Sequence, residues 1–105
     1  MKIIFIENYL QELYEDGKAK SKKHRFQTDI IKRYKSTIDK LRAANRIEDL
    51  FPIKSLNYEK LKGKEELESV RINDKYRIIF KSKIEGEPPN LITICSIMEL
   101  SNHYA

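Results

Sequence analysis

Two alternating segments on either side of Asn73-Asp74-Lys75 constrain the fold of this chain more than any other feature. Residues 67–73 and 76–83 alternate apolar and polar side chains with a period of two, which predicts half-buried strands. Asparagine and aspartate favour turns, because their side chains bond to nearby backbone groups. The two segments are therefore expected to form a β-hairpin.

The apolar side chains also predict the register of this hairpin. A two-residue turn would pair Ile72 with Lys75 and place Arg77 on the face of Val70. A three-residue loop pairs Ile72 with Tyr76 instead, and one face then carries Val70, Ile72, Tyr76, Ile78 and Phe80. A slip of one residue would turn one strand's apolar side chains to the wrong face, so the three-residue loop is expected.

In this register Arg71 and Arg77 lie directly opposite each other on the second face, together with Ile79 and Lys81. Like charges opposed across a strand pair are unfavourable unless an anionic group lies between or above them. The second face is therefore a candidate anion-binding surface.

Helical periodicity is found upstream of the hairpin. Tyr9, Leu10, Leu13 and Tyr14 recur at helical spacing, and Gly17 is a natural helix stop. A second helix is expected from Thr28 or Asp29, either of which can cap it. Its apolar stripe consists of Ile30, Ile31, Tyr34, Ile38 and Leu41.

The remaining segments complete an α+β order. Residues 2–6 read as a strand, residues 45–64 as an irregular connection with a helical turn near 47–50, and residues 91–98 as a central apolar strand. We expect an N-terminal strand and two helices packed on one face of a small, mainly antiparallel sheet that ends in a three-stranded meander. At 105 residues, one domain over positions 1–105 is expected. The face of Arg71 and Arg77 should be open or partly open.

Positive charge is concentrated in one segment. The chain carries a net charge of +5, and residues 18–42 alone contain ten Lys/Arg against two Asp/Glu. Such asymmetry indicates a polyanion or an acidic partner, although a solvated helix face would give the same pattern.

Several classes of site are not supported by the sequence. The one cysteine, Cys95, lies in an apolar run, which fits a buried thiol in a reducing cytosol better than a nucleophile. One cysteine and two distant histidines make no metal-ligand set, and no cofactor motif is present. The apolar start of the chain is too short for a signal peptide or a membrane span, so a cytoplasmic protein without membrane contact is expected.

The central block of the sequence contains three characteristic segments: Glu59-Lys60-Leu61-Lys62-Gly63, Ser69-Val70-Arg71-Ile72-Asn73 and Tyr76-Arg77-Ile78-Ile79-Phe80. Together they resemble the corresponding block of HigB-type toxins of the RelE/ParE superfamily. The resemblance extends over residues 35–105, but the chain ends in Asn102-His103-Tyr104, where such toxins often end in a motif like Asp-Tyr-His. The resemblance implies a RelE-like fold and a type II toxin that cuts mRNA in the ribosomal A site without a metal. It also implies a cognate antitoxin, expected to be of the helix-turn-helix type.

Metal-free cleavage of RNA needs a base, a cation near the phosphate and an acid for the leaving oxygen. Arg77 is the first candidate for the cation and Arg71 the second, and salt bridges to Glu68 or Glu99 are the alternative for both. His103 suits a proton-transfer role, and Tyr104 could stack on a base or supply a proton, unless both are frayed terminal residues. Glu99 could also act as a base, but an exposed carboxylate without a role in the reaction is the preferred interpretation.

Lysines are the candidate RNA-binding residues. Lys60 and Lys62 precede the hairpin, Lys81 lies on its second strand, and the basic segment contributes Lys20, Lys22 and Lys23. They could hold RNA phosphates, or an acidic antitoxin in the case of the basic segment, or simply be solvated. Two alternative functions stay open: a ParE-like toxin that inhibits DNA gyrase, and an inactive relative that only binds an antitoxin.

Overall fold

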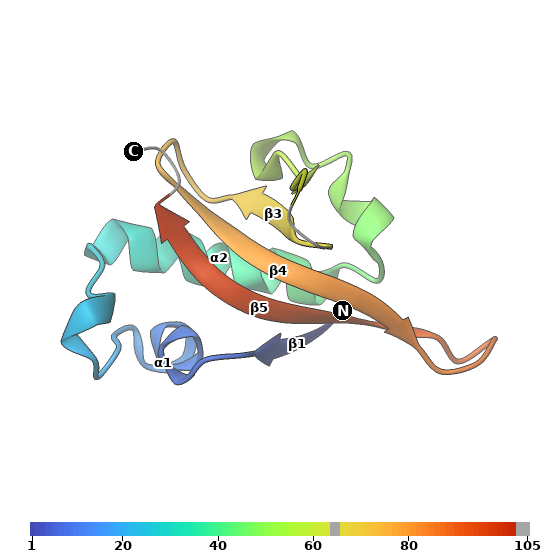
Figure 1. Ribbon diagram of the computed structural model, residues 1–105, viewed down its shortest axis with the longest axis horizontal. Helices are drawn as coiled ribbons and strands as arrows, with labels where there is room; N and C mark the ends of the chain where they lie inside the picture. Colours follow the sequence, from blue (N-terminus) through green and yellow to red (C-terminus); the bar gives the residue numbers. More distant parts are fainter. Residues whose placement is uncertain (64–65, 103–105) are drawn as a thin grey trace.

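The structure is a computed structural model that describes residues 1–63 and 66–102 (Figure 1). In chain order its main elements are β1 (Lys2–Phe5), α1 (Asn8–Asp16), α2 (Thr28–Ala43), β2 (Glu59–Lys60), β3 (Glu68–Arg71), β4 (Tyr76–Glu85) and β5 (Ile92–Asn102). Short 3-10 helices lie at Lys22–His24 (η1), Ile47–Leu50 (η2) and Lys54–Leu56 (η3).

The strands form one sheet in the order β1-β5-β4-β3-β2. β1 runs parallel to β5, and the other pairs are antiparallel. The predicted meander is confirmed as β3, β4 and β5. β2 was not predicted, because two residues give no measurable periodicity.

The predicted hairpin register is confirmed. Val70 pairs with Ile78 and Arg71 pairs with Arg77. The Ile72 N–H donates to the Tyr76 carbonyl over 3.1 Å, which closes the three-residue loop.

Both helices pack on one face of the sheet, as the apolar stripes predict (Figure 1). Tyr34 of α2 is fully buried, and its hydroxyl donates to the Leu10 carbonyl of α1 over 2.7 Å. The alternating hairpin residues Val70, Ile78 and Phe80 supply the sheet side of the core. Gly17 ends α1 in the left-handed conformation, with φ of 75°.

The structure corrects the prediction for the start of α2. The helix begins at Thr28, and Gln27 occupies the cap position without a side-chain bond, so neither Thr28 nor Asp29 caps it. Asp29 lies in the first turn instead, where a carboxylate stabilises the positive end of the helix dipole.

β5 is longer than its apolar run. It was predicted to end at Met98, after which the chain would leave the sheet, but it continues in the sheet to Asn102. A register shift between Ile79 and Phe80 explains why the extension was missed. Phe80 pairs with Ile97 and Ile79 with Glu99, so Met98 is an extra residue, and Leu100 returns to the core.

Cys95 is a core residue of β5, as predicted. Burial raises the pKa of its thiol to about 12, so at neutral pH it is a protonated apolar side chain. Across residues 1–63 and 66–102, none of the helices has the length and apolar character needed to cross a membrane.

Candidate functional site

The sheet face opposite the helices carries the candidate site. Side chains alternate along β4, so Arg77, Ile79 and Lys81 point away from the helix layer while Ile78 and Phe80 point into it. The paired positions add Ser69 and Arg71 from β3, Glu59 from β2, and Glu99 and Ser101 from β5. This set is called the open face below.

Arg77 is the most buried cation of the open face. The residue is 9% exposed, although the face that carries it was expected to be open or partly open. Its Nη1 atom lies 3.4 Å from Glu59 Oε2 and 3.4 Å from Ser69 Oγ. Half of the Glu59 side chain is exposed, so the pair presents its carboxylate to solvent and keeps its guanidinium covered.

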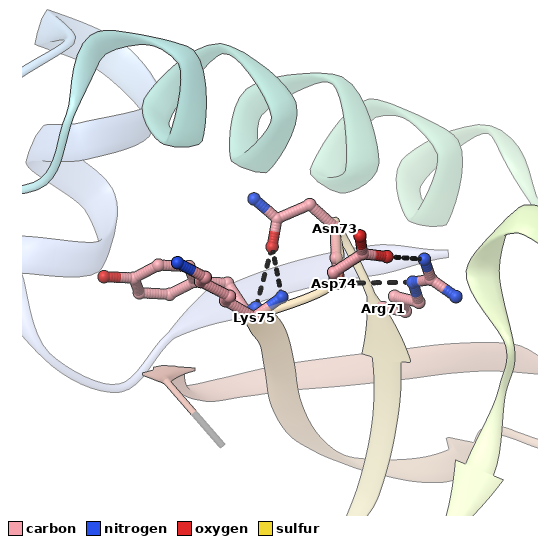
Figure 2. Close-up of polar contacts among 5 residues, drawn as sticks. Arg71, Asn73, Asp74 and Lys75 are labelled. Atoms are coloured by element: carbon pink, nitrogen blue, oxygen red, sulfur yellow. Dashed lines mark hydrogen bonds and ion pairs between the residues drawn. The ribbon is translucent and has the colours of Figure 1, made fainter. Parts of the chain in front are cut away.

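Arg71 lies directly across from Arg77 but has different partners (Figure 2). Its Nε donates to the Asn73 carbonyl over 3.1 Å, and its Nη2 forms an ion pair with Asp74. The Asn73 side-chain oxygen accepts from the backbone N–H groups of Lys75 and Tyr76, which fixes the turn. The side chain of Arg71 remains 46% exposed.

These contacts differ from the salt bridges considered as the alternative role of the two arginines. Among the described residues, Arg77 forms an ion pair with Glu59 and Arg71 with Asp74, where Glu68 or Glu99 had been considered. Glu68 cannot serve, because it pairs with Phe80 and therefore points to the helix side of the sheet. Carboxylates beside both arginines also explain how like charges are tolerated across the strand pair.

The candidate lysines are spread over different surfaces. Lys81 is exposed on the open face, whereas Lys60 pairs with Glu68 and lies on the helix side, away from Arg77. Lys62 is an exposed residue of the loop after β2. Lys20, Lys22 and Lys23 lie in and before η1, at the far end of the molecule from the β4–β5 turn (Figure 1).

His24, beside those lysines, is tied to the core. Its ring stacks on Tyr9 with centroids 3.6 Å apart and planes 4° apart. The arrangement anchors the basic segment to α1.

His103 and Tyr104 lie outside the described residues. The strand that precedes them does reach the open face: Ser101 pairs with Arg77 and Asn102 with Tyr76. Within the described ranges, no group of three His, Cys, Asp or Glu residues could hold a metal ion.

Glu59 is the residue of the open face that the sequence interpretation missed. It had been quoted only as part of the family-like block. Its position becomes evident only once Glu59 is paired with Ser69 in β2, and the two-residue strand gives no pattern from which that pairing could be inferred.

The fold places two helices on one face of a five-stranded sheet and the two arginines on the other face. The structure is similar to that of a YoeB/ParE toxin from Agrobacterium tumefaciens, with a TM-score of 0.53 and 16% sequence identity over 99% of this chain and 100% of that chain. At this identity the similarity shows the fold alone. None of the curated proteins matches the sequence.

The family assignment comes from a match over residues 3–98 to the HigB-like toxins, described as RelE-like toxins of the type II toxin-antitoxin system HigB. The chain belongs to this family. A type II toxin implies an antitoxin as its partner.

Proposed function

We propose that this toxin is a metal-independent endoribonuclease that cuts ribosome-bound mRNA. The observation that carries the proposal is the Glu59–Arg77 pair on the open face: an exposed carboxylate beside a guanidinium, with Arg71 across the strand pair. The carboxylate and the guanidinium groups correspond to the base and the cation, two of the three groups that cleavage through the 2′-hydroxyl requires.

Glu59 is the proposed base. It takes the proton of the ribose 2′-hydroxyl, whose oxygen then bonds to the adjacent phosphorus while the bond from phosphorus to the 5′-oxygen breaks. The products are a 2′,3′-cyclic phosphate and a 5′-hydroxyl end, and the leaving oxygen receives a proton from an acid. Arg77 orients the carboxylate and contributes positive charge beside the phosphate.

Arg71 is the proposed phosphate ligand at the surface. Its side chain is about half exposed, and a guanidinium can bond two phosphate oxygens at once. Lys81 adds positive charge on the same face. His103 and Tyr104 remain the candidates for the acid, because they follow Asn102 at the end of β5.

The proposed partners are the ribosome, its mRNA and a cognate antitoxin, expected to be of the helix-turn-helix type, in the cytoplasm. Lys20, Lys22, Lys23 and Lys62 are proposed to contact ribosomal RNA or mRNA phosphates. Lys60 lies on the helix side of the sheet, away from Arg77, and is left out of this set. These contacts would position the toxin without reading sequence. No cofactor is needed for the reaction proposed.

The test is primer extension on mRNA in a translation extract, with the parent protein and three variants. Glu59→Gln keeps the shape and removes the base, so cleavage should fall at least about a hundredfold. Arg77→Ala should lose a similar factor, about 3 kcal/mol of transition-state stabilisation. The control is Glu99→Gln, an exposed carboxylate on the same face, which should cut like the parent. Loss of cleavage in Glu99→Gln but not in Glu59→Gln would overturn the assignment of the base.

A further inference from the structure

A groove opens on the helix side of the sheet, beyond the end of the core. It has a volume of about 700 Å³ and lies between the 47–58 segment, the chain around β2, and the outer part of β4 and β5. The β4–β5 pair extends well past β3 here (Figure 1). Ser82 and Ile84 share the face of the core residue Phe80 but lie outside the core cluster.

The walls of the groove are apolar and aromatic. Ile84 is 67% exposed and Phe51 is 57% exposed, although both point toward the same hollow. The rings of Phe51 and Tyr58 lie against each other, with centroids 5.1 Å apart. Large apolar side chains gathered around a hollow often mark a site of interaction, whereas single exposed ones do not.

The floor of the groove is a buried carboxylate. Glu68 is 5% exposed and lines the groove, and it accepts a hydrogen bond of 2.5 Å from the Tyr58 hydroxyl and one of 2.6 Å from Ser82 Oγ. Burial and the Glu68 contact raise the pKa of Tyr58, which keeps the phenol protonated as a donor. Among the described residues, no Lys or Arg nitrogen forms an ion pair with Glu68.

A buried carboxylate of this kind favours a cationic ligand. A carboxylate has about four acceptor positions, so two hydroxyl donors leave capacity for more bonds. Buried carboxylates are usually paired with a cation, because their desolvation is otherwise costly.

The other charged residues of the groove also favour a cationic ligand. Glu48 and Glu66 line it as well, against Lys60 and Lys83, and Lys83 is already held 2.8 Å from Glu85. The faces of Phe51 and Tyr58 would add cation–π attraction. An RNA phosphate, in contrast, would meet the carboxylate of Glu68.

We propose that this groove binds a segment of a partner protein that presents an arginine or lysine between apolar side chains. The cation bonds to Glu68, and the flanking apolar side chains pack on Phe51 and Ile84. The groove is large enough for several side chains. Because it lies on the sheet side opposite Glu59 and Arg77, its occupant leaves the open face uncovered. This inference goes beyond the proposed function and does not depend on RNA cleavage.

The test uses three blocked pentapeptides of sequence leucine-valine-X-valine-leucine, with arginine, norleucine or glutamate at X, titrated into the ¹⁵N-labelled full chain. The arginine peptide should shift the amide signals of Tyr58, Glu68, Ser82 and Ile84. The norleucine peptide should bind about tenfold more weakly, as expected for loss of a charged hydrogen bond, and the glutamate peptide should not bind. Equal binding of the arginine and norleucine peptides, or no binding of either, would overturn the proposal.

Three variants test whether the peptides bind in the groove. Glu68→Gln should abolish the preference for arginine over norleucine, and its thermal unfolding shows whether the fold is kept. Ile84→Ala changes an exposed side chain, so the variant should fold normally. It should weaken the binding of both the arginine and the norleucine peptide. Ile92→Ala is the matched control, an exposed isoleucine on the opposite face of the same hairpin, and should bind like the parent. Unaltered binding in Ile84→Ala, or shifts of the groove amides by a short RNA in place of the peptides, would contradict the proposal.

Discussion

At the scale of single residues, the two arginines of the open face have different surroundings and therefore different expected roles. Arg77 is covered and held beside Glu59 and Ser69, so its position is largely set before substrate binds. Arg71 is exposed and bound to a neighbouring carboxylate that an incoming phosphate would have to replace. Preorganised charge is effective because it costs little reorganisation during the reaction.

Asp74 should therefore weaken RNA binding. In Asp74→Asn the ion pair with Arg71 is lost, and the guanidinium is available to a phosphate. We expect a few-fold tighter binding of a short RNA, measured by fluorescence anisotropy, and a log–log salt slope steeper by roughly one. Asp16→Asn, an exposed carboxylate at the end of α1, is the control. A parent-like salt slope in Asp74→Asn would show that Arg71 does not bind phosphate.

Cys95 should be inert in the folded protein. Its thiol is fully buried, and its pKa of about 12 leaves almost no thiolate at neutral pH. Reaction with a thiol-specific chromogenic reagent should be slow and should accelerate to the free-thiol rate when denaturant unfolds the chain. Rapid reaction under native conditions would contradict the packing of β5.

At the scale of elements, the alternating hairpin and the helix stripes were predictable from sequence because periodicity reports burial directly. Val70 and Ile78 face the core, and Tyr34 lies on the buried side of α2, as their spacing indicates. The two-residue strand β2 and the extra residue at Met98 were not predictable, since neither leaves a periodic signal. The candidate site was only partly predictable for the same reason: Arg71 and Arg77 follow from the hairpin register, but Glu59 depends on β2.

The basic segment should contribute to ribosome binding through its positive charge. Replacing Lys20, Lys22 and Lys23 with glutamate should weaken association with ribosomes and flatten its salt dependence, because each phosphate contact contributes to the slope. Thermal stability should change little, as η1 has no buried residues. Sedimentation of toxin with ribosomes at several salt concentrations measures this. An unchanged slope would assign the segment to solvent or to an antitoxin contact.

At the scale of the whole molecule, the sheet separates two surfaces. The open face carries the Glu59–Arg77 pair, and the helix side carries the core and, beyond it, the groove over Glu68. β4 runs through both regions, from Arg77 near its start to Ile84 near its end. Chemistry on RNA and binding of a protein segment can thus occupy opposite sides of one sheet.

Removing His103 to Ala105 tests whether the end of the chain contributes to the reaction. The deletion leaves β5 intact to Asn102, so the melting temperature should stay within a few degrees of the parent's. Toxicity in growing cells should be lost if His103 or Tyr104 supplies the acid. His103→Gln separates proton transfer from shape, because glutamine forms hydrogen bonds but does not titrate. A fully toxic truncated protein would remove both residues from the mechanism.

The most direct test of the proposed reaction is the chemistry of the cut ends, with purified ribosomes carrying a defined mRNA. We expect the parent toxin to release fragments that end in a 2′,3′-cyclic phosphate and begin with a 5′-hydroxyl, and Glu59→Gln to release almost none. The same mRNA without ribosomes should stay intact. Fragments with 3′-hydroxyl and 5′-phosphate ends would contradict attack by the 2′-hydroxyl. Intact mRNA together with inhibition of DNA gyrase would contradict the ribonuclease proposal and support the alternative, a ParE-like gyrase inhibitor.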